Sequence, residues 1–250
     1  MRHLEPRTAA MRDRIILLLV VLAAACLPRS AAAQDPSDSA TYMALTRTPL
    51  AALPAALDVG ITGERARGVS FRARYGIMSY DTHEYIHDFG LGLDLPVGRS
   101  TIALTAGYHW NRCNGTCSSH FMASAGLSRN LLEASLGAGE HAAGLGVGLQ
   151  TQLGFARPGD TTLVAGKIAV PVALVPSSGT LRFVPYVSPG LGLGLARQNG
   201  STEAGLLFVL DAGLGVMTAG GFSASLGVSR AFLKGGNWLV GLDLAVGTWR

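Results

Sequence analysis

The segment His83-Glu84-Tyr85-Ile86-His87 matches the zinc-binding pattern H-E-x-x-H. Two histidines at this spacing, with the glutamate as general base, bind zinc on a helix, where they lie one turn apart on the same face. On an extended strand they would be about 13 Å apart and could not share a metal. Because Gly90 and Gly92 follow at once in an alternating pattern, the sequence favours a strand. We therefore interpret the motif as coincidental and predict no metal site.

A second group of reactive side chains surrounds a short loop. His109 and His120 approach one another if the segments that carry them pair as a hairpin. Together with Asp88, Ser118 and Ser119 they would supply the nucleophile, base and carboxylate of a hydrolase. No hydrolase motif matches residue by residue. The favoured interpretation is that these are polar residues of a loop and of a barrel interior, with no catalytic residue.

The first residues resemble a targeting segment. Arg12 and Arg14 precede an apolar run, Ile15–Leu27, which is followed by small residues. This pattern is typical of a cleaved secretory signal peptide, which we place at residues 1–33. The run is shorter than the roughly 20 residues that a membrane helix needs, so an uncleaved anchor is a weaker alternative, as is a lipid on Cys26.

Cysteine usage and charge both agree with export. Without the leader only Cys113 and Cys117 remain, and Asn114-Gly115 between them favours a tight turn. We predict that they form a disulfide, because a zinc site would need two further ligands. The formal charge of +4 falls to about +1 without the leader, which argues against nucleic acid as a partner.

The elements that must position these residues are predicted from strict alternation. In Gly144–Phe155 apolar residues occupy every second position, with glycine or glutamine between them. This two-residue period predicts a strand rather than a helix. Similar segments recur from Leu57 to Val246 and give eleven or twelve strands, most of them longer than the usual five or six residues of soluble sheets. We predict a turn at Arg129-Asn130. Three prolines should weaken or break strands; they are Pro171, Pro185 and Pro189.

The residue types on the non-apolar faces of these strands indicate which face lines the interior of the barrel. A soluble barrel would display many charged residues outward, but here the faces opposite leucine and valine carry glycine, serine, threonine and glutamine with few charges. Charged residues make up 14% of the chain, against about 25% in soluble domains. We therefore predict that the apolar faces meet lipid and that the polar faces line the lumen. The predicted lumen-facing residues are Arg72, Arg74, Asp88, Asp94, His109, Glu133, Gln150, Gln152, Lys167, Arg182, Asp211 and Asp243.

With a signal peptide and glycine-rich alternating strands, the chain resembles the small bacterial outer-membrane β-barrel proteins over roughly 57–250. The resemblance implies an all-β fold, an antiparallel transmembrane β-barrel of about 10–12 strands. We assign the barrel to residues 55–250, after an irregular linker at 34–54. It also implies outer-membrane lipid and the barrel-assembly machinery as partners. Such proteins typically end on an aromatic residue, whereas this sequence ends Trp249-Arg250.

The expected function is that of a structural barrel or a narrow pore for small solutes in the outer membrane, without a cofactor and not an enzyme. Two alternatives remain open. One is a barrel hydrolase acting on lipid, with the site near His109 and His120. The other is a soluble periplasmic barrel that binds an apolar ligand. The sequence does not fix the oligomeric state.

Overall fold

The computed structural model describes residues 68–81, 84–98, 100–112, 119–136, 143–176, 180–218, 220–232 and 238–247. The predicted signal peptide, the linker, a possible strand near Leu57, and both Cys113 and Cys117 lie outside the described residues. No helix in the described part of the chain is long and apolar enough to span a membrane.

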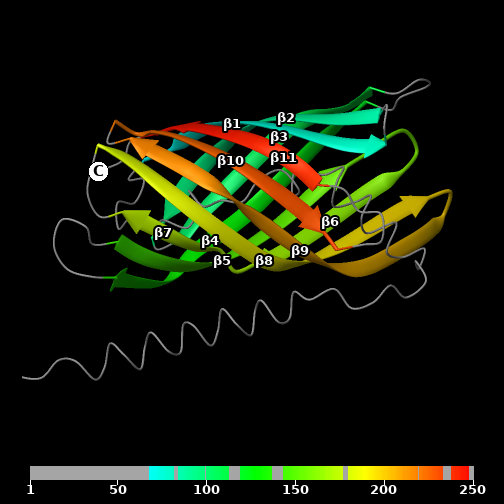
Figure 1. Ribbon diagram of the computed structural model, residues 1–250. Coiled ribbons are helices and arrows are strands. Elements are labelled where there is room, and N and C mark those ends of the chain that lie inside the picture. Colours follow the sequence, from blue (N-terminus) through cyan, green and yellow to red (C-terminus); the bar gives the residue numbers. More distant parts are fainter. Residues whose placement is uncertain are drawn as a thin grey trace, which may run out of the picture. The chain divides into compact units, whose positions relative to one another are not determined.

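The described residues form one antiparallel sheet that closes on itself (Figure 1). Apart from β6 and β7, which do not pair with each other, each strand pairs with its neighbours along the chain, and β1 pairs with β11 to close the barrel. The strands are β1 Ser70–Asp81, β2 Glu84–Val97, β3 Ser100–Arg112, β4 His120–Leu136, β5 Ala143–Ala156, β6 Thr162–Ala169, β7 Val172–Pro176, β8 Leu181–Gln198, β9 Ser201–Thr218, β10 Phe222–Ala231 and β11 Trp238–Val246.

Strands β6 and β7 occupy a single position in the barrel. Both pair with β5 on one side and β8 on the other, and the register does not change between them. The break falls at Pro171, which has no N–H to donate to the ladder. The flanking bonds persist, from the Val170 amide to the Pro189 carbonyl and from the Gly148 amide to the Pro171 carbonyl, both at 2.9 Å. The barrel therefore has ten strand positions, within the predicted range and even-numbered as in bacterial barrels.

The predicted turn at Arg129-Asn130 is wrong. These residues lie inside β4, which continues for 17 residues. The apolar residues before and after this point are out of phase by one position, a pattern that either a turn or a β-bulge can produce. The structure has the irregularity of a bulge, with a register shift between Asn130 and Leu132 against β5.

The prolines of β8 also behave differently from the prediction. Pro185 and Pro189 do not break the strand, which pairs with β9 from Leu181 to Gln198 without a shift. The interruption lies in the neighbouring position, at Pro171. On its other side, β8 has Pro189 opposite Val170 in this break, and its pairing with β7 ends at Tyr186, next to Pro185.

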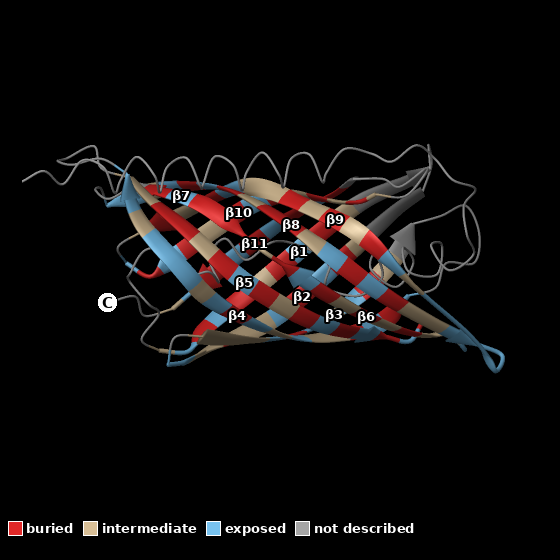
Figure 2. Ribbon diagram, turned by 90° about the horizontal axis from the view of Figure 1, so that it is seen from below, coloured by how far each residue is buried: buried red, intermediate tan, exposed pale blue. Residues whose placement is uncertain are grey.

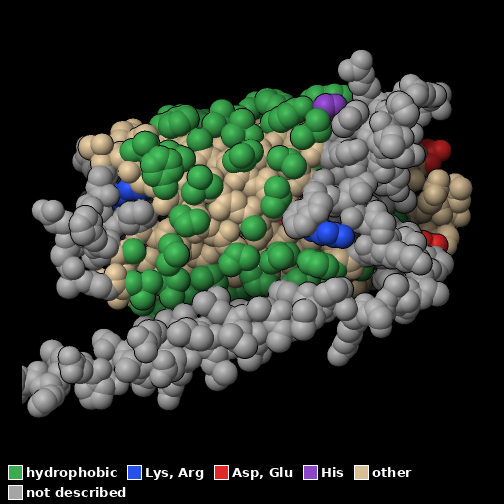
Figure 3. Space-filling model, in the orientation of Figure 1, with side chains coloured by type: hydrophobic (Ala, Val, Ile, Leu, Met, Phe, Trp, Pro, Cys, Tyr) green, Lys and Arg blue, Asp and Glu red, His purple; other side chains and the backbone are tan. Residues whose placement is uncertain are grey.

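Burial alternates along the strands in the inverted sense (Figure 2). On β10, Phe222 and Leu226 are exposed while Ser223 and Ser225 are buried. Large apolar side chains cover the outside, among them Phe71 at 67% exposure and Leu153 at 59%. On the face that Figure 3 shows, apolar side chains are spread over the described outer surface, with few charged side chains among them. The predicted inside-out arrangement is thus confirmed.

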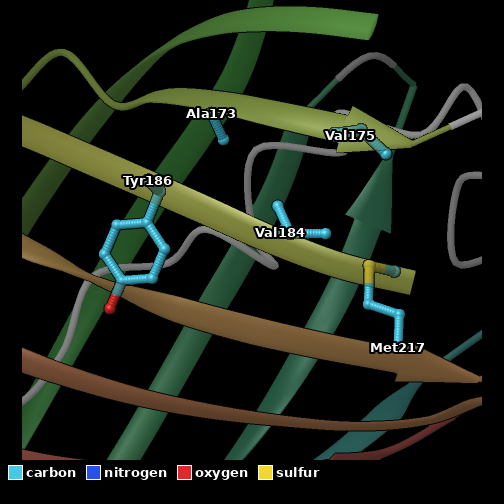
Figure 4. Packing of buried hydrophobic residues seen from close by; sticks show 5 residues of the cluster. All are labelled: Ala173, Val175, Val184, Tyr186 and Met217. Atoms are coloured by element: carbon cyan, nitrogen blue, oxygen red, sulfur yellow. The ribbon is translucent and has the colours of Figure 1, made fainter. Parts of the chain in front are cut away.

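One part of the interior is apolar. Ala173, Val175, Val184, Tyr186 and Met217 are buried together and come from β7, β8 and β9 (Figure 4). They lie near the end of the barrel where β7 meets β8 and β9 meets β10. Other apolar side chains, among them Met122 and Leu163, are buried elsewhere in the barrel, beside the charged groups described below.

Candidate functional site in the barrel interior

The structure places most of the predicted lumen residues inside. Ten of them are 9% exposed or less: Arg72, Arg74, Asp88, Asp94, His109, Gln150, Gln152, Lys167, Asp211 and Asp243. Arg182 is half-buried. Glu133 pairs with the buried Gly146, and this pairing places Glu133 on the inner face. Near the end of β4, however, its side chain is exposed and accepts a hydrogen bond from the side-chain amide of Asn130.

An ion-paired network joins β1, β2 and β11. The Arg72 guanidinium contacts Asp94 through Nη2 at 2.5 Å and Asp243 through Nη1 at 3.3 Å. The Arg74 Nε donates to the same Asp243 Oδ2 at 2.9 Å, and the Ser70 hydroxyl donates to Asp94 at 3.2 Å. Because the alternation places these residues on one face of three adjacent strands, two positive and two negative charges neutralise each other along the wall.

A second buried ion pair spans a strand. The Lys167 ammonium on β6 lies 2.7 Å from an Asp211 carboxylate oxygen on β9, although β8 runs between the two strands. On β8 the residue that pairs with Lys167 is Gly192, which has no side chain to obstruct the lysine stem. This is one physical reason for glycine on the inner faces of these strands.

The third polar group confirms the predicted approach of the two histidines. His109 pairs with Asp88 on β2 and with His120 on β4, so the three side chains share the inner face. The His109 Nδ1 is hydrogen-bonded to Asp88 Oδ1, and the two imidazole rings stack with centroids 4.4 Å apart and an interplanar angle of 28°. Of the two serines considered with this group, Ser119 is exposed, and Ser118 lies outside the described residues.

The zinc-like motif is extended where it is described. Glu84, Tyr85, Ile86 and His87 belong to β2, and His83 lies outside the described residues. The described part of the chain contains no group of three or more His, Cys, Asp or Glu side chains that could hold a metal ion. His87 instead contacts Tyr75 and Trp110 on the outer face.

Several buried polar atoms inside the barrel have no hydrogen-bond partner among the described protein groups. Those on the inner faces include Gln150 Oε1, Gln152 Oε1, Tyr186 OH, Ser188 Oγ, Asp211 Oδ1, Ser223 Oγ, Ser225 Oγ and Asp243 Oδ1. Native proteins leave few such atoms without protein or water partners, and a polar cavity satisfies them with water. The interior is therefore suited to hold water between its ion pairs.

Sequence reasoning missed Tyr186 and the inner-face serines Ser188, Ser223, Ser225 and Ser229 as individual site residues. The alternation contained the signal for the serines of β10, because each alternates with an apolar residue. Tyr186 was obscured by Pro185 and Pro189, which made the strand assignment in this segment less regular.

An antiparallel barrel with apolar side chains outside and polar side chains inside defines the class of outer-membrane β-barrels. No protein-family model and no curated protein matches the sequence. Among solved structures, the transport unit of the autotransporter AIDA-I from Escherichia coli is similar with a TM-score of 0.48 at 12% identity, over 85% of this chain and 98% of that one. LpxR from Salmonella typhimurium gives 0.40 at 7% identity, over 72% and 99%. The outer membrane enzyme PagL gives 0.38 at 12% identity, over 71% and 99%.

These comparisons correct one expectation. The prediction that the chain is not an enzyme is contradicted, because the structures with which it shares the barrel fold include the outer membrane enzyme PagL. The architecture is thus no ground for excluding catalysis. At 12% identity the likeness extends to the fold alone and assigns no activity to this chain.

Proposed function

We propose that this protein is an integral outer-membrane barrel that provides a narrow pore for small solutes. One observation carries the proposal: the barrel has apolar side chains outside, and buried ion pairs and polar atoms inside. Buried polar atoms without a protein partner are usually hydrogen-bonded to water. The interior side chains are almost fully buried, so the path is narrow. This agrees with ten strand positions, because barrels of about eight strands are filled by side chains, whereas wide aqueous channels have 16–18 strands.

The test is conductance in planar lipid bilayers. The folded protein should give small, reproducible single-channel steps. Ser225→Trp places a large ring in the lumen, because Ser225 is 2% exposed on the inner face, and it should reduce the conductance several-fold. Its neighbour Ala224 lies on the opposite face, so Ala224→Trp is the matched control and should conduct like the wild type. A folded protein without any steps, or equal steps from both variants, would refute the pore.

A second candidate function, hydrolysis of a lipid or another ester, is favoured by one observation. Asp88 is hydrogen-bonded to Nδ1 of His109, which is how a carboxylate orients a histidine that acts as a general base. Cells that express His109→Ala should then differ in envelope lipid composition from cells that express the wild type. Identical lipid profiles at equal expression would sink this candidate, without any bearing on the pore.

A further inference from the structure

A polar cluster lies on the outer face of the barrel, where apolar residues are otherwise the rule. The Tyr75 hydroxyl and His87 Nδ1 are 2.8 Å apart, within hydrogen-bond distance. The His87 ring stacks on Trp110 with centroids 5.4 Å apart and an interplanar angle of 12°, and it lies 6.1 Å from the Tyr75 ring. We call these three residues, on β1, β2 and β3, the outer aromatic cluster.

The position of the cluster matches one edge of the membrane. His87 stands near the start of β2, and the outward residues after it, Phe89 and Leu91, are 42% and 58% exposed. The outward face of β2 ends at Val97. At a rise of about 3.3 Å per residue and a tilt of about 40°, the distance from His87 to Val97 across the membrane is about 25 Å. This is the height of the apolar band of such barrels, so His87 lies at the level of the lipid headgroups.

The hydrogen bond between Tyr75 and His87 leaves a donor available in every protonation state. If the tyrosine donates to Nδ1, the neutral imidazole carries its proton on Nε2. If Nδ1 donates instead, the tyrosine hydroxyl keeps its own proton for another acceptor. The imidazolium form supplies both donors and a positive charge. The Trp110 indole N–H is a further donor on the same cluster.

We propose that the outer aromatic cluster is a binding site for the phosphate of a membrane lipid headgroup. A phosphate offers only acceptor oxygens, which suits a cluster that always presents a donor. The half-buried His87 interrupts a lipid-facing surface, where a polar ring is costly unless it meets the headgroup layer. The aromatic rings on both sides of it are the residue types that settle at this level. The site is independent of the pore.

The experiment compares lipid retention by the purified, refolded barrel in detergent, measured by native mass spectrometry. The probes are phosphatidylglycerol and diacylglycerol, which share their acyl chains but differ in the phosphate. His87→Phe keeps an aromatic ring and removes the donor, and Tyr75→Phe removes the hydroxyl. Tyr108→Phe is the matched control, because Tyr108 is an exposed outward tyrosine of β3 outside the cluster.

We expect His87→Phe to lower the retention of phosphatidylglycerol several-fold, Tyr75→Phe to lower it less, and neither to change the retention of diacylglycerol. Tyr108→Phe should behave like the wild type. Heat-modifiable gel mobility confirms that each variant is folded.

Equal phosphatidylglycerol retention by His87→Phe and the wild type overturns the proposal. So does an equal loss in Tyr108→Phe, which would mean that a general aromatic surface is responsible. Free inorganic phosphate in excess should not displace the lipid, and displacement would show that the site binds phosphate rather than lipid.

Discussion

At the scale of single residues, Asp243 is the acidic group that two guanidinium groups share. It accepts from Arg72 and Arg74 at 3.3 and 2.9 Å and is 1% exposed. In Asp243→Asn, Arg74 keeps its charge in a buried position but loses its negative partner, and Arg72 is left with Asp94 alone. Breaking a buried pair on one side costs about 3–5 kcal/mol, so we expect the free energy of unfolding to fall by about 3 kcal/mol.

Urea titration of the barrel folded into phospholipid vesicles measures this change. Asp160→Asn is the control, because Asp160 is exposed in the turn between β5 and β6 and its loss should change the free energy by less than about 0.5 kcal/mol. If the two variants unfold at the same urea concentration, Asp243 does not neutralise the arginines in the folded barrel.

At the scale of elements, close packing of adjacent strands requires glycine at particular positions. A Cβ at Gly213 on β9 would lie 2.3 Å from the Leu226 carbonyl oxygen and 2.3 Å from the Tyr186 hydroxyl. The first contact is with backbone of β10, so the strand itself would have to move. Gly213→Ala should therefore lower the free energy of unfolding by about 1–3 kcal/mol. Gly166→Ala is the control, because its Cβ would meet nothing nearer than 3.8 Å, and it should unfold like the wild type in the same urea titration.

The break between β6 and β7 gives another prediction. The two residues of a hydrogen-bonded pair in an antiparallel ladder exchange both N–H···O bonds. Gly148 already donates to the Pro171 carbonyl at 2.9 Å, so these two residues occupy such a pair. In Pro171→Ala the new amide should donate to the Gly148 carbonyl and join the two segments. The gain of about 1 kcal/mol is offset by the greater freedom of the unfolded chain, so stability should change little. Slow hydrogen exchange at the new amide is the expected readout, and exchange at the rate of an open amide would contradict it.

Alternation was sufficient to predict most strands and their inner faces, because successive residues of a strand face opposite sides of the sheet. It failed near the start of β5, where Leu145 is buried although its alternate neighbours Leu149 and Leu153 are exposed. It did not distinguish a turn from a bulge at Asn130, since both shift the phase by one residue. It also could not predict which buried charges pair. Lys167 meets Asp211 across an intervening strand, and that contact depends on the registers of β6 and β9 against β8.

The same limit applies to the histidines. Alternation placed His109 on the inner face, and hairpin pairing of β3 with β4 brought it beside His120. The contacts of His87 on the outer face could not be predicted, because its spacing from His83 and Glu84 indicates only a zinc-like motif. Only the pairing of three strands shows that Tyr75 and Trp110 are its neighbours.

At the scale of the whole molecule, inversion of the usual burial pattern is the property on which the outer-membrane assignment depends. A soluble barrel would bury leucine and expose its charges. This barrel buries Arg72, Lys167 and Asp211 while Phe71 and Leu153 are largely exposed. A charge on the outer face should therefore cost far more than the same charge on the inner face, and only for a barrel that folds in lipid.

Leu153 and Gln150 on β5 allow this comparison within one strand. Leu153 is 59% exposed and pairs with Ala125 and Gly166, away from any charged partner, whereas the outward Leu149 pairs with Arg129. In Leu153→Lys the ammonium would meet the hydrocarbon core at a cost of about 2–4 kcal/mol near the midplane. In Gln150→Lys the ammonium enters the polar interior beside Gln152 and should cost less. Refolding into phospholipid vesicles, followed by urea titration, measures both. An equal loss of stability in the two variants would mean that the apolar face does not meet lipid, and the outer-membrane assignment would then be wrong.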